Sequence, residues 1–172
     1  PHFTIVESTI VDGQKEASQI GKIKIYIALG NLFSFKNIEI RDLIIENANF
    51  NLNKKNYNFF LKLLNKNFQD GNLLIKNSNV FFKNSDEEVL FINKIAKMKF
   101  SYNPKELKNI FIADNEIFNI PYSMESFYNN KKNKILSLIN INLMKLKIEN
   151  ELTLNNKKKI GKSKLIFNKL KQ

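Results

Sequence analysis

Apolar residues recur at every second position in the clearest segment of this sequence. Residues 20–29 read IGKIKIYIAL, so Ile23, Ile25 and Ile27 alternate with lysine and tyrosine side chains. Successive side chains of an extended chain point to opposite sides, so a period of two indicates a strand with one apolar and one wet face. The alternation returns in residues 98–102. This pattern limits the fold more than any other feature, because it favours sheets over helices.

One ten-residue pattern occurs twice, thirty positions apart. Residues 43–52 read LIIENANFNL and residues 73–82 read LLIKNSNVFF. Each has an apolar run, a polar Asn-X-Asn break and a second apolar run. The pattern predicts two copies of a strand-turn-strand unit that bends at its asparagines. Residues 146–154, LKIENELTL, match as a third copy in which Asn-Glu replaces the Asn-X-Asn joint.

One segment changes to helical spacing. In residues 56–68, NYNFFLKLLNKNF, apolar residues recur at intervals of three and four, and Asn56 or Asn58 can serve as the N-cap. This spacing predicts one short helix near residues 56–67. Elsewhere apolar runs alternate with polar turns rich in asparagine. We therefore expect a mainly β fold, a curved antiparallel sheet or groove of many short strands.

The length of 172 residues favours a single β-rich domain that is large enough to bury a core. An apolar fraction of 43% argues for a folded chain. No uninterrupted apolar run approaches the roughly eighteen residues that span a membrane. The chain opens PHFTIVEST, without a methionine or a signal pattern. We interpret residues 1–172 as a piece of a longer chain that lacks an N-terminal segment.

The net charge of +12 is the obvious sign of a nucleic-acid partner. Arg41 is the only arginine, however, and the abundant Lys, Asn, Ile and Phe share A/T-rich codons, so biased composition explains the charge more simply. Proteins that read DNA sequence favour the bidentate fork of arginine. We expect no specific nucleic acid, although a basic domain that binds nucleic acid or an anionic glycolipid remains an alternative.

The residues needed for catalysis are mostly missing. His2 is the only histidine and there is no cysteine, which argues against metal sites built on those ligands and against a Ser-His-Asp triad. Pairs of carboxylates act in glycosidases, but charged loops explain the acidic residues here more simply. We expect neither enzymatic activity nor a cofactor. The nearest acidic candidates are Asp86, Glu87, Glu88, Asp114 and Glu116.

The apolar side of such a sheet needs a cover, because large apolar patches are rarely left in water. The cover is a second sheet or an apolar ligand. An acyl chain of about sixteen carbons would gain on the order of 12 kcal/mol on burial, before association costs. We predict that the apolar face contacts lipid. Its candidate residues are Ile23, Ile25, Ile27, Phe33, Phe35, Phe50 and Leu52.

The order of these elements resembles that of the AsmA family of periplasmic proteins from Gram-negative cell envelopes. The resemblance runs through residues 1–13, 22–64, 72–88 and 117–128, which together make up 85 of the 172 residues. It is a pattern of hydrophobicity and turns, without catalytic residues to carry over. The chain departs from the family at Ala48, where the family often has proline, and in the polar loop after Leu52, which lacks the usual Asp-Gly.

The resemblance implies a non-enzymatic envelope protein of outer-membrane biogenesis. The family has a single inner-membrane anchor ahead of a β-rich periplasmic body, and larger relatives are thought to conduct phospholipids along a β groove. The expected partners are therefore phospholipid or another acyl lipid, the membrane through the missing anchor, and other envelope proteins. A purely structural β module of a larger envelope protein remains a further alternative.

Overall fold

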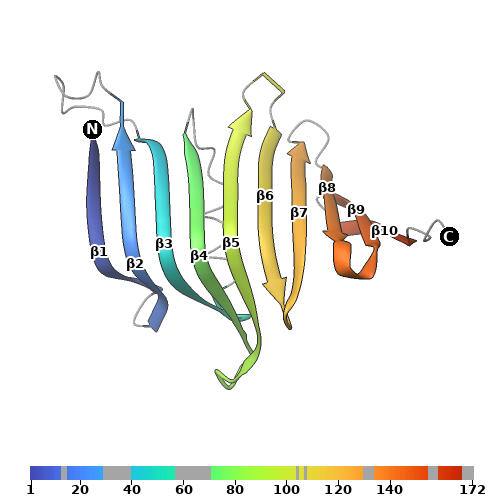
Figure 1. Cartoon of the computed structure of the whole chain (residues 1–172), viewed down its shortest axis with the longest axis horizontal. Helices are drawn as coiled ribbons and strands as arrows, with labels where there is room; N and C mark the ends of the chain where they lie inside the picture. The colour runs from blue at the N-terminus through green and yellow to red at the C-terminus, as the bar shows by residue number, and fades with distance from the viewer. Residues whose placement is uncertain are drawn as a thin grey trace.

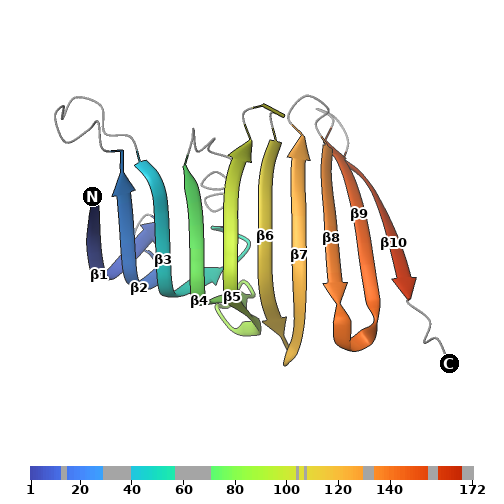
Figure 2. The same cartoon turned by 45° about the horizontal axis from the view of Figure 1, so that its top comes forward.

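The computed structural model describes residues 1–12, 15–28, 40–56, 71–103, 105–106, 108–129, 134–154 and 159–167. Within them, ten strands form one open sheet whose spatial order follows the chain from β1 to β10 (Figures 1 and 2). The mainly β, curved-sheet prediction is confirmed. The strands are β1 (His2–Asp12), β2 (Lys15–Ile27), β3 (Ile40–Leu52), β4 (Asn72–Lys83), β5 (Val89–Asn103), β6 (Lys108–Ile117), β7 (Ile120–Asn129), β8 (Lys134–Ile141), β9 (Leu146–Leu154) and β10 (Lys159–Phe167).

The strands are longer than the sequence pattern predicted, at 8 to 15 residues each. The repeated segments account for part of this difference. Each was expected to be two strands around a turn, but each is one continuous strand, β3 and β4. Asn47 and Asn77 have left-handed backbone angles, with φ of 57° and 46°. Such a residue bulges and bends a strand without ending it, so the asparagines are bends within strands.

The bend crosses five neighbouring strands at one level. The pairings on either side align Glu7 of β1, Gly21 of β2, Asn47 of β3, Asn77 of β4 and Ala96 of β5. A Cβ added to the glycine would lie 3.1 Å from the Cβ of the asparagine beside it, so this crowded position favours glycine. Ala96 has no counterpart in β6, because Ile95 and Lys97 pair with the consecutive residues Asn115 and Asp114. The bend therefore ends at β5, as the curving lower parts of β3 to β5 show in Figure 1.

Strands β3 and β4 are parallel, which corrects the expectation of purely antiparallel neighbours. Every paired residue differs from its partner by thirty positions, so the two copies of the repeat lie side by side in register. The Nδ2 of Asn79 donates to the Oδ1 of Asn49 at 2.9 Å, and the Nδ2 of Asn72 donates to the Oδ1 of Asp42 at 2.8 Å. The repeat thus stacks identical positions, and its polar side chains bond across the pair.

The predicted helix near residues 56–67 falls almost wholly outside the described residues. Of that range only Asn56 is described, and it lies buried in a turn after β3. Its Oδ1 accepts a hydrogen bond from the N–H of Asn53 at 2.9 Å, and its Nδ2 donates to the backbone oxygen of Asn51 at 2.7 Å. The side chain therefore bonds to the backbone of the residues that precede it.

The third copy of the repeat is wrong as a structural prediction. Strand β9 contains this copy and pairs antiparallel with β8 and β10, far along the sheet from β3 and β4. None of its described residues has a left-handed backbone. The match in residues 146–154 was therefore one of composition, without the bulge that defines the other two copies.

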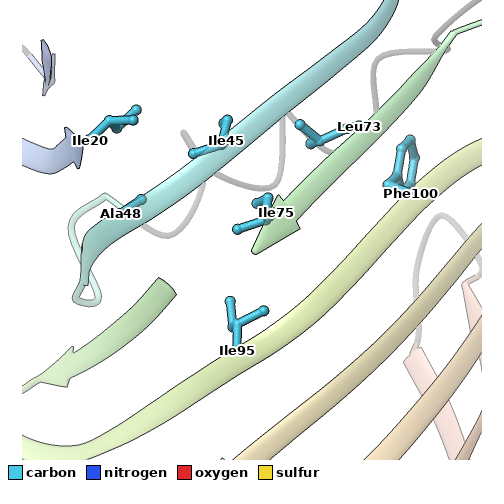
Figure 3. Packing of buried hydrophobic residues seen from close by; sticks show 7 residues of the cluster. All are labelled: Ile20, Ile45, Ala48, Leu73, Ile75, Ile95 and Phe100. Atoms are coloured by element: carbon cyan, nitrogen blue, oxygen red, sulfur yellow. The ribbon is translucent and has the colours of Figure 1, made fainter. Parts of the chain in front are cut away.

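The core lies on the inner side of the bend. Its residues come from strands β2 to β5 and belong to both sides of the bend (Figure 3). At the bend itself Asn47, Asn77 and Ala96 are exposed, whereas Ala48 is fully buried. The open sheet therefore curves toward its apolar side. The buried cluster consists of Ile20, Ile45, Ala48, Leu73, Ile75, Ile95 and Phe100.

The sheet is much more open than a compact protein. The chain exposes 12401 Å² at a mass of 20.1 kDa, whereas a compact monomer of that mass exposes about 8,700 Å². A single curved sheet leaves much of its two faces accessible, which contributes to the difference. A large surface is therefore available for a ligand or a partner.

The left-handed backbone of Asn47 gives a testable prediction. Valine is β-branched and tolerates this conformation poorly, so Asn47→Val should lower the free energy of unfolding by about 1–2 kcal/mol. The matched control is Asn51→Val in the same strand, where the backbone is extended and valine is favoured. Urea unfolding followed by circular dichroism measures both. Equal losses in the two variants would refute the role assigned to the bulge.

Candidate functional site

The sheet separates apolar from charged residues. We call the side that holds Ile45 and Ile75 the apolar face, and the side that holds Lys24 and Glu46 the charged face. Because side chains alternate along a strand, residues paired directly across strands share a face. The pairing of the strands therefore assigns each described strand residue outside the bends to one of the two faces.

One row of the apolar face crosses the entire sheet without a polar residue. Its ten members are paired in register, one from each strand. The row spans roughly 43 Å, because neighbouring strands lie about 4.8 Å apart. Its residues, from β1 to β10, are Ile5, Ile23, Ile45, Ile75, Met98, Ala113, Met124, Ile139, Ile148 and Leu165.

The row beside it on the charged face has the opposite character. It includes Lys22, Glu46, Lys76, Lys97 and Asp114, again paired in register. Ion pairs form across this face, but they are partly or fully exposed and contribute little stability individually. They are Lys24–Glu46 at 3.3 Å, Lys94–Glu116 at 2.5 Å, Lys134–Glu151 at 2.5 Å and Lys147–Glu149 at 2.9 Å.

Exposure of the apolar face rises toward both ends of the sheet. Ile45 and Ile75 in the centre are 7% and 5% exposed, whereas Ile5 of β1 and Leu165 of β10 are 44% and 59% exposed. Phe167, at the end of β10, is 67% exposed. The central strands thus use this face as their core, and the outer strands leave it accessible.

The structure brings five of the seven predicted lipid-contacting residues onto the apolar face. Ile23 and Ile25 pair with the core-facing residues of β3, and Ile27 at the end of β2 is buried. Phe50 and Leu52 lie on the same face beyond the bend, where they pair with Val80 and Phe82 of β4. The remaining two, Phe33 and Phe35, lie outside the described residues.

The sequence prediction missed the second half of the apolar row. Met124, Ile139 and Ile148 continue it through β7, β8 and β9. The mostly apolar run of residues 135–141, ILSLINI, was a usable signal for the strand β8. Alternation does not reveal which residues of different strands are neighbours, however, so a continuous row was not foreseeable.

Uncharged polar groups interrupt the apolar face in a few places. The Tyr122 hydroxyl donates to the Oδ1 of Asn93 at 3.0 Å. Burial raises the pKa of Tyr122, and a hydrogen bond with the side chain of Asn115 opposes this shift. The Oδ1 of Asn115 is itself buried without a partner. In the neighbouring part of the face, the hydroxyls of Ser126 and Ser137 share a hydrogen bond of 2.8 Å.

Three of the acidic candidates lie in a turn, and the other two lie in a strand. Asp86, Glu87 and Glu88 are exposed in the turn between β4 and β5, where the Oδ1 of Asn84 accepts hydrogen bonds from the backbone N–H groups of Asp86 and Glu88 at 2.9 Å. These contacts explain the residues as parts of a turn.

The remaining candidates, Asp114, Glu116 and His2, also lie on the surface of the sheet. Asp114 and Glu116 lie on the charged face of β6, the latter paired with Lys94. His2 is exposed and stacks on Tyr26 with a ring separation of 5.1 Å. Among the described residues, no group of three or more histidine, cysteine or acidic side chains is arranged to hold a metal ion.

Shallow hollows of the surface lie on the charged face. One of about 460 Å³ is lined by residues of β7 to β10, with Phe127, Leu136 and Leu138 among charged side chains. Another of about 360 Å³ includes Asp42 and Lys97 in its lining. These hollows combine apolar and charged groups, whereas the apolar row is an extended surface.

Comparison with known proteins adds no family. No protein-family model matches the chain, and no curated protein is significantly similar to it. In the part of the chain that the structure describes, no helix has the length and hydropathy required to cross a bilayer. The two faces of the sheet are therefore the features that point to a function.

Proposed function

We propose that this chain is part of a non-enzymatic cell-envelope protein that shields or conducts the acyl chains of phospholipids along its apolar face. The observation that carries this proposal is the uninterrupted apolar row of ten residues across all ten strands. The resemblance to the AsmA family supports it. From the same resemblance we further propose that the full-length protein lies in the periplasm, is anchored to the inner membrane and has a role in outer-membrane biogenesis.

The dimensions of the apolar row suit an acyl chain. The hydrocarbon core of a bilayer is about 30 Å thick, so one leaflet contributes acyl chains of about 15 Å. A row of roughly 43 Å exceeds that length. A lipid can therefore lie along it and change position without meeting a charged side chain, while its headgroup stays in water. Burial of the acyl chain contributes about 0.8 kcal/mol of binding free energy per methylene.

The exposed ends of the apolar face also favour a ligand. The outer members Ile5 and Leu165 are 44% and 59% exposed, so the row is accessible at β1 and at β10. A self-contained structural module would cover such residues with its own second layer. The partners that fit this surface are acyl lipids and envelope proteins that continue the row.

A basic nucleic-acid-binding surface is the weaker alternative. The lysines of the charged face are interspersed with carboxylates, and Lys24, Lys94 and Lys134 each contact a glutamate. A nucleic-acid surface needs lysines that can release counterions from phosphates, and its affinity falls steeply with salt. Binding of single-stranded or duplex nucleic acid that weakens sharply between about 50 and 200 mM salt would favour this alternative.

Lipid extraction tests the proposed function directly. The chain, produced in the periplasm of a Gram-negative host and purified without detergent, should retain phospholipid that is detected by mass spectrometry after solvent extraction. A periplasmic protein of similar size and charge, purified in parallel, controls for carry-over. Protein free of lipid that also fails to take up a fluorescent phospholipid from vesicles would overturn the proposal.

A further inference from the structure

We propose that the free edge of β10 binds an extended peptide strand in which acidic residues alternate with apolar residues. Among the described strands, β10 pairs with β9 alone and ends the sheet (Figure 2). Such an edge presents unpaired backbone N–H and C=O groups, and addition of a strand satisfies them. The side chains on the two faces of β10 decide which strand fits.

Charge alternates from strand to strand as the sheet approaches this edge. Lys134 of β8 contacts Glu151 of β9 at 2.5 Å, and Glu151 is paired in turn with Lys162 of β10. Glu149 of β9 is paired in the same way with Lys164 of β10. Both lysines of β10 are exposed, and their charges face an edge with no strand beyond it in the described structure. A strand with carboxylates at the two opposite positions continues the alternation.

Both carboxylates of β9 already contact lysines outside β10: Glu149 contacts Lys147 of its own strand, and Glu151 contacts Lys134 of β8. The pKa of Glu149 is lowered first by its hydrogen bond with Lys147, and the pKa of Glu151 by its hydrogen bond with Lys134. Lys162 and Lys164 make smaller contributions to the same two carboxyls. Lys162 and Lys164 thus retain the capacity to pair with carboxylates of an added strand.

The apolar face of β10 determines which residues should alternate with the acidic ones in the added strand. Leu165 and Phe167 of β10 are 59% and 67% exposed, although their partners in β9 are half-buried. Apolar residues at alternate positions of an added strand would cover them and lengthen the apolar row by one strand. An alternating acidic and apolar strand therefore satisfies the backbone, the lysines and the exposed apolar side chains together.

A second copy of this chain fits the edge less well. Two β10 edges would oppose lysine with lysine, and lysine on an edge strand is a common device against self-association. The other free edge, β1, places Thr4 and Val6 on the charged face, as their pairing with Lys24 and Lys22 shows. The two acidic residues of β1, Glu7 and Asp12, are five positions apart, so this edge offers no pair of carboxylates at alternate positions to match Lys162 and Lys164. The two lysines therefore disfavour pairing with a second β10 edge and favour pairing with an acidic strand.

The experiment uses the whole chain, labelled with ¹⁵N, and two synthetic nine-residue peptides. One alternates glutamate with leucine or valine, and the other has lysine in place of each glutamate. The glutamate peptide should shift and protect the amides of residues 159–167 and leave those of β1 unchanged. Two opposite-charge pairs across strands should make it bind roughly tenfold tighter than the lysine peptide.

A charge exchange tests the role of the two lysines. The double variant Lys162→Glu and Lys164→Glu should reverse the preference between the peptides. The matched control, Lys97→Glu with Lys99→Glu, makes the same change at two exposed lysines of the charged face on the interior strand β5 and should leave the preference unchanged. Equal binding of both peptides to the unaltered chain, responses confined to β1, or self-association through β10 would each overturn the proposal.

Discussion

Replacement of Phe100 by alanine is expected to lower the free energy of unfolding by about 3–5 kcal/mol. Phe100 is 5% exposed on β5 and pairs with Leu73 on one side and Phe111 on the other. In an open sheet few layers surround the core, so the large side chains on the apolar face supply much of the burial. Natural domains have only about 5–15 kcal/mol of stability in total, so this loss is severe.

The control for this variant is Phe118→Ala. Phe118 lies in the turn between β6 and β7, is 73% exposed and contacts the ring of Phe91, so its truncation should cost no more than about 0.5–1.5 kcal/mol. Urea unfolding monitored by circular dichroism provides both values, with tyrosine fluorescence as a second probe because the chain has no tryptophan. Similar losses in the two variants would show that the cluster around Phe100 is not the core of the folded chain.

A charge placed on the apolar row should abolish lipid retention. Met124 lies in β7 between Ala113 and Ile139 of the neighbouring strands, in the accessible half of the row. Lysine at this position would put an ammonium group against the acyl chain, and an unpaired charge without water is strongly unfavourable. We expect Met124→Lys to reduce the phospholipid retained per protein at least about tenfold, as a penalty of about 1.4 kcal/mol suffices for that.

The adjacent residue supplies a matched control. Ser123 precedes Met124 in β7 and points to the charged face, where it pairs with Asp114 and Asn140. Ser123→Lys adds the same charge to the same strand but should leave lipid retention unchanged. Equal effects of the two substitutions would indicate that total charge, and not the apolar row, governs the lipid content. Circular dichroism spectra of both variants verify that the sheet is retained.

The repeat shows how a local pattern and its tertiary role differ. Its asparagines were expected to bend the chain, and Asn47 and Asn77 do so with left-handed backbones. The two copies also stack in parallel, thirty positions apart, where Asn79 donates to Asn49. This stacking aligns the bends of β3 and β4 at the same level, so the sheet curves as a unit and its core lies inside the curve.

Several features of the candidate site were predictable because they are local. The alternation of Ile23 and Ile25 with lysines determines that these residues share a face of a strand, whatever that strand pairs with. Phe50 and Leu52 likewise share the second apolar run of the repeat. The near absence of histidine, cysteine and arginine is a property of composition, and it shaped the expected function without any fold.

The tertiary structure alone decided register, direction and exposure. Pairing of strands joins residues far apart in the chain, and a shift of one residue would move every side chain to the other face. The sequence therefore did not reveal that β3 and β4 are parallel, that β9 lacks the bulge of its apparent copies, or that ten strands align one unbroken apolar row. Alternation determined that an apolar face exists, but only the register made that face continuous, because continuity depends on contacts between strands.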